Sequence, residues 1–457
     1  MRPTIEHAPK PIDALRPMSA PLVALALLMC SLLFTARVSI AEPRFGDSTW
    51  VAPQLPGDGS PADEGPRVAK PDRERTWETI LRAPFRLLFF PVRIVARCSE
   101  AVAAPVAGHL ANQQHLTTPP RGVTVSPAVS YFGAAGPGIG PNIKIPSVLG
   151  PGSSLKLSGT WSTLDTRELR LRGTVGEGVS AIGFDVLASY IYRPNQRFFG
   201  IGNESRAEDF SIYLNRDSRA DASVFLGRIP TRRIRVLAGI SGVGIGGGYH
   251  GTPLAENVFT PAEVPFLTEG SQVASYGLGG DFAAIDRVDE PSLGVHLLGE
   301  ARKFKSVDGT NLNYNFWRGE ARGYLPVLSA RRVLGLRLVY EGVDPLAGSA
   351  PVPFYRLPES TGPDRFAAFA SHRLRDQELI LAHAEYRWII WDKRVWALLL
   401  AQAGEVARHR DDFTLDGRHA SVGGGFRGRL SPSTIGRLEV AHGNEGWQVN
   451  LNLKGDF

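Results

Sequence analysis

The sequence predicts an all-β fold, a closed transmembrane antiparallel β-barrel of about 16 strands with an N-terminal Pro-rich and amphipathic-helical extension. From Gly122 onward, segments of about ten residues alternate apolar and polar side chains and are separated by Gly, Pro, Asn and Asp turns. The 50 glycines and 34 prolines among 457 residues disfavour long helices. The N-terminus has the features of an export signal, which directs the chain beyond the cytoplasm.

Residues 1–41 are interpreted as the signal peptide. Basic residues precede the apolar run Leu22–Phe34, and small residues end the segment at Ala41, where a signal peptidase would cleave. The run is shorter than the about 20 residues of a membrane-spanning helix, although a retained N-terminal anchor is the alternative. Cleavage after Ala41 would remove Cys30 and leave Cys98 as the single thiol, which excludes an internal disulfide.

Two further segments separate the signal from the predicted strands. Residues 42–75 form a Pro-rich linker with few apolar residues to bury. Residues 76–121 form an amphipathic helical segment on the periplasmic side, in which Ile80–Val95 is interrupted by arginines and prolines. An arginine at mid-bilayer costs about 2.5–3.5 kcal/mol, which excludes a spanning helix here. We expect this segment either to lie on a membrane surface or to pack against the folded body.

Residues 122–457 are predicted to be the barrel. The alternation is clearest from Trp447 to Phe457 and from Ile380 to Trp388. In a soluble sandwich the apolar face would be the core, whereas in an outer-membrane barrel it meets lipid and the polar face lines a wet lumen. The export signal and the mixed charges on the polar faces favour the barrel. Fifteen to seventeen alternating segments can be counted, and sixteen is predicted because bacterial single-chain barrels have even strand numbers.

One irregularity is predicted within these strands. Between Asn315 and Arg318 the alternation slips by one residue. A β-bulge adds one unpaired residue and moves the side chains that follow to the opposite face, so the slip predicts a bulge at this point.

Composition and motif spacing argue against several other classes of function. The net charge is only +6, from 51 basic and 45 acidic residues, and it forms no basic block, so no nucleic-acid partner is predicted. Two cysteines exclude a Cys-rich zinc site, and no His-Glu-x-x-His spacing occurs, so no cofactor or metal is predicted. No Gly-x-Ser-x-Gly nucleophile elbow occurs either, and no enzymatic activity is expected.

Three segments carry motifs in a fixed order. The first is RPNQRFFGIGNESRAEDFSIY at residues 193–213, the second ends in RLRDQELILAHAEYRW at residues 361–388, and the third is AQAGEVA at residues 401–407. They resemble the FFG-x-GN segment, the sixth-loop motif and the Asp-x-Gly-x-Val strand of the BamA/TamA superfamily, also called the bacterial surface antigen family. With the terminal aromatic residue Phe457, the resemblance covers residues 122–457. It implies a barrel in the outer membrane of a Gram-negative bacterium.

The sixth-loop motif is altered at its central position. In the superfamily it reads Leu-Arg-Gly-Tyr followed by Arg-x-Arg-Asp, and the first arginine reaches into the lumen and pairs with acidic wall residues. That arginine is replaced by Ala367. We expect the loop still to fold inward, with Arg365, Arg373 or Arg375 paired to an inward carboxylate such as Glu385. The alternative is that these charges are merely solvated. The aligned candidate residues are Phe366, Ala367, Ala368, Phe369, Arg373, Arg375 and Asp376.

The resemblance leaves two hypotheses for function. The favoured one is a role in outer-membrane protein assembly, secretion or lipid handling, in which an imperfectly closed seam between the first and last strands opens laterally. The implied partners are outer-membrane lipids, unfolded outer-membrane protein or lipid clients, and the barrel-assembly machinery that would recognise Phe457. The competing hypothesis is a passive pore or structural barrel. Residues 42–121 show no POTRA domain, and Ala367 favours this second hypothesis, whereas Arg373, Arg375 and Glu385 favour the first.

Overall fold

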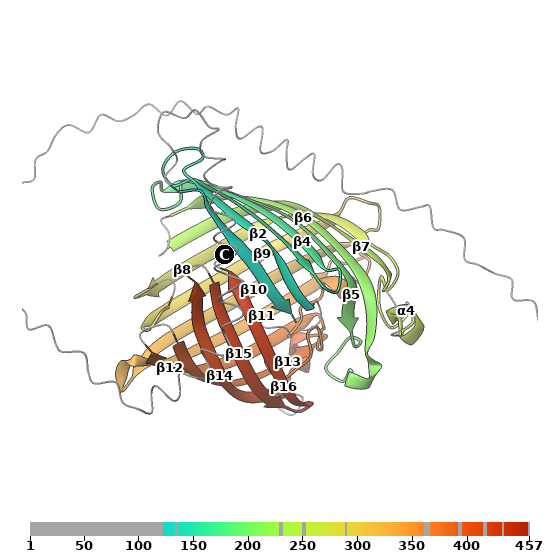
Figure 1. The fold of residues 1–457 in the computed structure, drawn as a ribbon. Helices are drawn as coiled ribbons and strands as arrows, with labels where there is room; N and C mark the ends of the chain where they lie inside the picture. The colour runs from blue at the N-terminus through green and yellow to red at the C-terminus, as the bar shows by residue number, and fades with distance from the viewer. Residues whose placement is uncertain are drawn as a thin grey trace, which may run out of the picture. The chain divides into compact units, whose positions relative to one another are not determined.

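In the computed structural model, one antiparallel sheet of sixteen strands runs in chain order from β1 to β16 (Figure 1). The structure describes residues 122–132, 136–227, 232–248, 253–287, 290–360, 366–391, 395–414, 418–431 and 434–455. The strands are β1 (Thr124–Phe132), β2 (Gly136–Pro146), β3 (Ser154–Ser162), β4 (Arg167–Val175), β5 (Ile182–Phe198), β6 (Ser211–Leu226), β7 (Arg232–Gly247), β8 (Ser271–Ile285), β9 (Gly294–Ser306), β10 (Asn313–Val327), β11 (Ser329–Pro345), β12 (Glu378–Trp391), β13 (Val395–Ala407), β14 (His419–Ser431), β15 (Thr434–Gly443) and β16 (Gly446–Gly455). The predicted all-β fold and strand number are confirmed.

Two strands illustrate how an apolar outer face alternates with a more polar inner face. In β16, Trp447 and Val449 are 71% and 68% exposed on the outer face. In β12, Ile380 and Trp388 lie on the outer face, and Glu385 lies between them on the inner face. This is the alternation of an outer-membrane barrel, whose outer side chains meet lipid and whose inner side chains line the lumen.

The connections at the two ends of the strands differ in length. The β5–β6 connection (199–210), the β7–β8 connection (248–270) and the β11–β12 connection (346–377) share one end, because neighbouring strands are antiparallel. At the opposite end, Leu328 alone links β10 to β11. Outer-membrane barrels have long extracellular loops and short periplasmic turns. We therefore assign the long-loop end of the barrel to the extracellular side.

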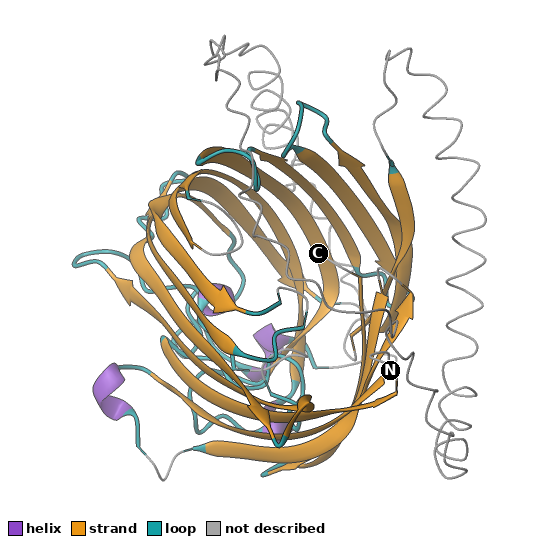
Figure 2. Cartoon of the chain, turned by 90° about the vertical axis from the view of Figure 1, so that its left-hand side faces the viewer, coloured by secondary structure: helices purple, strands orange, loops and turns teal. Residues whose placement is uncertain are grey.

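The long loops pack together rather than extending from the barrel. One buried cluster joins the end of β5, the short helix α4 (Ala255–Val258) and the 3-10 helix η2 (Phe354–Arg356). Its centre is Phe354, whose ring lies 4.7 Å from the Phe198 ring and 4.9 Å from the Tyr213 ring. Loops and short helices cross the interior of the strand ring in Figure 2. The extracellular end of the lumen is therefore filled by protein.

The predicted bulge between Asn315 and Arg318 is wrong. The pairing of β10 with β9 and with β11 continues through these residues without a shift. The apparent slip arises because Tyr314 and Phe316 face inward and contact the apolar cluster that also contains Val352 of the β11–β12 loop. An inward-folded loop makes part of the lumen apolar, so an apolar side chain there does not mark the lipid face.

The first strand and the last strand of the sheet are neighbours. Strands β1 and β16 approach within 8 Å between Cα atoms. The hydrogen-bonded order nevertheless ends at these two strands, because no β1–β16 pairing occurs among the residues that the structure describes. The sheet thus curls until its edges are neighbours, and this pair of edges is the seam of the barrel.

Several sequence predictions fall outside the described ranges. These are the signal peptide at residues 1–41, the linker at residues 42–75, the segment at residues 76–121, Arg365 and Phe457. Within the part of the chain that the structure describes, no helix is long and apolar enough to cross a membrane.

Candidate functional site

The candidate site is the end of the β11–β12 loop, residues 366–376, which we call the inner loop. Phe366 and Leu374 are 2% and 0% exposed, and they pack against Leu381 of β12 and Leu400 of β13 in one cluster. Burying a side chain of this size stabilises a fold by about 1.5–3 kcal/mol. The loop therefore lies inside the barrel on an apolar seat formed by inward-facing residues. The full cluster is Val339, Phe366, Ala367, Ala368, Phe369, Leu374, Leu379, Leu381, Leu398, Leu400, Val406 and Ala441.

Ala367 is held through its backbone. Its N–H donates to Gln402 Oε1 of β13 at 2.8 Å, and its carbonyl accepts from Asn450 Nδ2 of β16 at 2.5 Å. Gln402 also accepts from the Ser421 hydroxyl of β14 at 2.9 Å. Backbone groups buried in protein need such partners. The loop therefore needs no charged side chain at residue 367 to be fixed to the wall.

Gly443 allows the inner loop to approach β15 closely. A Cβ at this position would stand 2.8 Å from Ala368 Cβ and 2.9 Å from the carbonyl oxygen of Ala420. Both distances are shorter than ordinary van der Waals contact. Small residues on both sides, Gly443 on the wall and Ala368 on the loop, therefore set the depth at which the loop sits.

Arg373 links the inner loop to the β5–β6 loop and to the β15–β16 turn. Its Nε donates to Glu445 Oε1 of the β15–β16 turn at 2.6 Å, and its Nη1 donates to the Ser205 hydroxyl of the β5–β6 loop at 2.7 Å. Its guanidinium also lies 5.4 Å from the centre of the Phe199 ring. The side chain is only 3% exposed. A guanidinium buried with a carboxylate, a hydroxyl and an aromatic face is well matched to its surroundings.

Arg375 is buried among aromatic residues. Its Nη2 donates to Glu359 Oε2 at 2.8 Å, and its Nη1 donates to the carbonyl oxygen of Phe354 at 3.0 Å. The Phe198 and Phe354 rings lie 5.8 and 5.7 Å from the guanidinium carbon. Arg375 therefore joins the inner loop to the aromatic cluster that fills the extracellular end.

The three segments that carry the superfamily motifs meet at this point. The N–H of Gly202 donates to the Arg375 carbonyl at 2.8 Å, which joins the FFG-x-GN segment to the inner loop. Asn203 of the same segment accepts from the N–H of Val406, in the AQAGEVA strand, at 3.5 Å.

Burial raises the pKa of the neighbouring Asp376 carboxyl, although its hydrogen bond from the N–H of Gln377 works in the opposite direction.

Glu385 faces the lumen as expected, but its partners come from the wall. Its carboxylate lies 2.8 Å from Arg437 of β15 and 3.5 Å from Arg387 of its own strand. Arg373 and Arg375 instead contact Glu445 and Glu359. Among the described residues, Glu385 thus contacts wall arginines and neither Arg373 nor Arg375, while Arg365 lies outside the described ranges. Arg437 also contacts Glu439, so its guanidinium lies between the carboxylates of Glu385 and Glu439.

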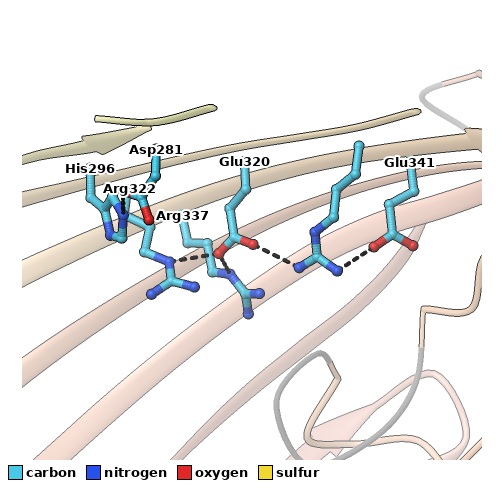
Figure 3. A network of polar contacts seen from close by, with 7 residues as sticks. Asp281, His296, Glu320, Arg322, Arg337 and Glu341 are labelled. Atoms are coloured by element: carbon cyan, nitrogen blue, oxygen red, sulfur yellow. Dashed lines mark hydrogen bonds and ion pairs between the residues drawn. The ribbon is translucent and has the colours of Figure 1, made fainter. Parts of the chain in front are cut away.

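Below the inner loop the lumen wall is charged. In Figure 3, dashed lines join Glu320 of β10 to both Arg322 and Arg337. The Nε of each arginine lies 2.6 Å from Glu320 Oε1. Arg318 bridges Glu320 and Glu341 at 2.7 and 2.6 Å. These ion pairs join β10 to β11 across the inner face. Unlike the apolar seat of the loop, this wall consists of residues that can face water.

The sequence predicted an inward loop but not the residues that hold it. Ala367, Arg373 and Arg375 all lie in the lumen and are buried. The partners that sequence reasoning missed are Ser205, Glu359, Gln402, Gly443, Glu445 and Asn450. Ser205 and Gln402 lie within two quoted motif segments, so those segments could have indicated them. The others lie in turns and on strands, where the sequence holds no comparable signal.

The fold is similar to that of outer-membrane β-barrels of the BamA type. BamA from Haemophilus ducreyi, in a structure lacking POTRA domains 1–3, matches with a TM-score of 0.54 at 16% identity, covering 72% of this chain and 69% of that chain. The expected resemblance is confirmed at the level of the fold. No protein-family model matches the sequence, and no curated protein sequence matches it significantly.

Two structures of CdiB are also similar. CdiB from Escherichia coli has a TM-score of 0.49 at 12% identity, covering 75% of this chain and 64% of that chain. CdiB from Acinetobacter baumannii has a TM-score of 0.47 at 13% identity, covering 72% of this chain and 59% of that chain. The present chain thus matches less than two thirds of the length of each CdiB chain.

Proposed function

We propose that this chain is an outer-membrane barrel that acts at the seam between β1 and β16, in the assembly or secretion of membrane proteins or in lipid handling. The observation that carries the proposal is the seam itself, where the first and last strands are neighbours and no pairing between them occurs among the described residues. Unpaired strand edges accept a further strand by backbone hydrogen bonding. A client strand or a lipid would enter the membrane sideways at this point.

The filled lumen favours a function at the seam over a function as a passive pore. The inner loop and the aromatic cluster around Phe354 occupy the interior beneath the long loops. Ala367 is hydrogen-bonded to Asn450 of β16, so the loop also contacts one of the two seam strands. We infer that the inner loop positions β16 at the seam, while free passage of solutes along the barrel axis is blocked.

Cysteine cross-linking of the seam tests the proposal. In a background with Cys30→Ser and Cys98→Ser, cysteine pairs would join residues 124–128 of β1 to residues 449–455 of β16, in a strain depleted of the native copy. Oxidation should abolish complementation, and reductant should restore it. The matched control pairs Gly280→Cys with Gly299→Cys, which face each other in β8 and β9 with open space at both positions. This control bond should leave function unchanged.

A census of outer-membrane proteins and lipids after depletion supplies the readout. Loss of particular membrane proteins or lipids, restored only by an uncross-linked seam, would support the proposal. A seam locked by disulfides that still complements fully would contradict it and favour a structural barrel. Fractionation should place the chain in the outer membrane, with the altered migration of unboiled samples that a stable barrel gives.

A further inference from the structure

We propose that the lumen contains a binding site for a phosphate group, in the cavity between the inner loop and the short-turn end of the barrel. The cavity has a volume of about 560 Å³. Its roof includes Ala367, and its walls come from β10 to β15. Six arginines and two glutamates line it: Arg318, Arg322, Arg337, Arg387, Arg427, Arg437, Glu385 and Glu439. We call it the arginine cavity.

The wall carboxylates are already engaged by arginines. Glu385 and Glu439 both contact Arg437, at 2.8 and 2.5 Å. Glu320, beside the cavity, contacts Arg318, Arg322 and Arg337. The remaining positive charge therefore concentrates on the β12–β14 side of the cavity.

Arg427 of β14 is the guanidinium left without a carboxylate. No ion pair includes it among the residues that the structure describes, and it lies 5.7 Å from the Trp396 ring centre. The charged groups that act on it are Glu385, Arg387, Arg437 and Glu290. Arg387 and Arg437 repel this guanidinium, whereas Glu385 and Glu290 attract it and offset that repulsion without forming a direct ion pair with Arg427. A bound anion would relieve this repulsion.

Two neighbouring groups complete the site. Arg387 is 92% buried, because its exposed fraction is 8%, and its Nη2 donates to the carbonyl of Pro291 at 2.9 Å. That bond fixes the guanidinium at the cavity wall. The Nε2 of His383, which also lines the cavity, is buried without a hydrogen-bond partner. Buried polar atoms are normally satisfied, so an unsatisfied ring nitrogen at a basic cavity indicates a missing partner.

The guanidinium groups that line the cavity favour a phosphate monoester as its ligand. Guanidinium groups bind phosphate oxygens through paired, charge-assisted hydrogen bonds, and several can share one group. The cavity volume falls within the range of about 300–1,000 Å³ of sites for small organic molecules. It can therefore hold a phosphate together with part of the molecule that bears it. This inference depends on the lumen geometry and not on the proposed action at the seam.

Ligand-dependent stability tests the site with the full chain refolded in a zwitterionic detergent. Inorganic phosphate is titrated while ionic strength is held constant with sodium chloride, and thermal unfolding is followed by tryptophan fluorescence. A ligand that binds only the folded state raises the midpoint in a saturable way. Arg427→Gln should weaken the apparent phosphate affinity about tenfold, the cost of one charge-assisted bond. The control is Arg170→Gln, a lumen-facing arginine of β4 outside the cavity, 43% exposed, which should bind as the native chain does.

A second variant keeps the test decisive if Arg427→Gln does not fold. Arg427→Lys retains the charge but not the paired donors, and it should weaken binding by a smaller factor. Short-chain phosphatidic acid is then compared with inorganic phosphate. Tighter, Arg427-dependent binding of the lipid assigns the site to a headgroup, and equal binding assigns it to free phosphate. An effect no larger than that of chloride, or one equal in Arg427→Gln and Arg170→Gln, would overturn the proposal.

Discussion

The two halves of the lumen are built on different principles. Toward the long loops, inward residues such as Leu381 and Leu400 are buried beneath the inner loop and behave like the core of a soluble protein. Toward the short turns, inward residues of the same strands are charged, as Glu385 and Arg387 show. One strand, β12, contributes to both halves. The difference teaches that period-two alternation fixes which residues face inward, while the loops decide whether the interior there is dry or wet.

The difference also explains how the loop holds without the superfamily's central arginine. In the half of the lumen toward the long loops, which we call the dry half, backbone hydrogen bonds and apolar burial hold Ala367. In the half toward the short turns, which we call the wet half, Arg437 of the wall contacts Glu385. Loop attachment and wall charge pairing are thus separate here, and four experiments can test that separation.

The largest effect is expected for Arg375→Ala in the dry half. It would remove the 3% exposed guanidinium that contacts Glu359 and the Phe354 carbonyl, while His372 would still contact Glu359. Removing one member of a buried ion pair costs about 3–5 kcal/mol, and we expect about 3 because Glu359 is partly exposed. Denaturant unfolding in detergent measures it. Arg170→Ala, at an exposed arginine, should change the unfolding free energy by less than about 0.5 kcal/mol. Equal losses in both variants would refute the buried role of Arg375.

The next effect is expected for Gly443→Ala. The added methyl would meet Ala368 and the Ala420 carbonyl, and such overpacking costs about 1–3 kcal/mol. Limited proteolysis should show the inner loop becoming cleavable as it moves from its seat. Gly299→Ala is the matched control, because nothing lies within 4 Å of its added Cβ. If the loop stayed protected in Gly443→Ala, close approach at this position would not set its depth.

The separation itself is tested by a double-mutant cycle in the wet half. Glu385→Gln combined with Arg437→Gln should show a coupling free energy of about 1–2 kcal/mol, because the pair is largely buried and 2.8 Å apart. Glu385→Gln combined with Arg373→Gln should be additive, because Arg373 contacts Glu445 instead. Strong coupling in the second cycle would show that the loop and wall charges act together after all.

The smallest effect concerns Asp376. Burial raises the pKa of its carboxyl in the folded state above the value in the unfolded chain. Stability linked to this proton is therefore present below the unfolded pKa and is lost as pH rises through the folded pKa. Asp376→Asn should gain stability relative to the native chain as pH rises from about 4, the unfolded pKa of an aspartate, through the raised folded-state pKa. An unfolding free-energy difference that is constant across this range would contradict the raised pKa.

Much of the barrel could be predicted from the sequence because its signals are local. The alternation around Ile380–Trp388 and Trp447–Leu451 directly reports two environments on two faces. The bulge that the sequence wrongly predicted at Asn315–Arg318 shows where inference from the local pattern fails. Tyr314 and Phe316 are apolar because a distant loop covers them, and the strand itself holds no sign of that contact.

The sequence by itself determined the strand number, the inward and outward faces, and the inward position of Glu385, because each depends on a repeat of two residues. Only the tertiary structure decided the partners. Arg373 meets Ser205 and Glu445, and Ala367 meets Gln402 and Asn450, across separations of 35 to 168 residues. Curling the sheet brings distant strands around one lumen, so the nearest opposite charge or acceptor is set by the barrel's geometry. A linear pattern cannot specify that choice.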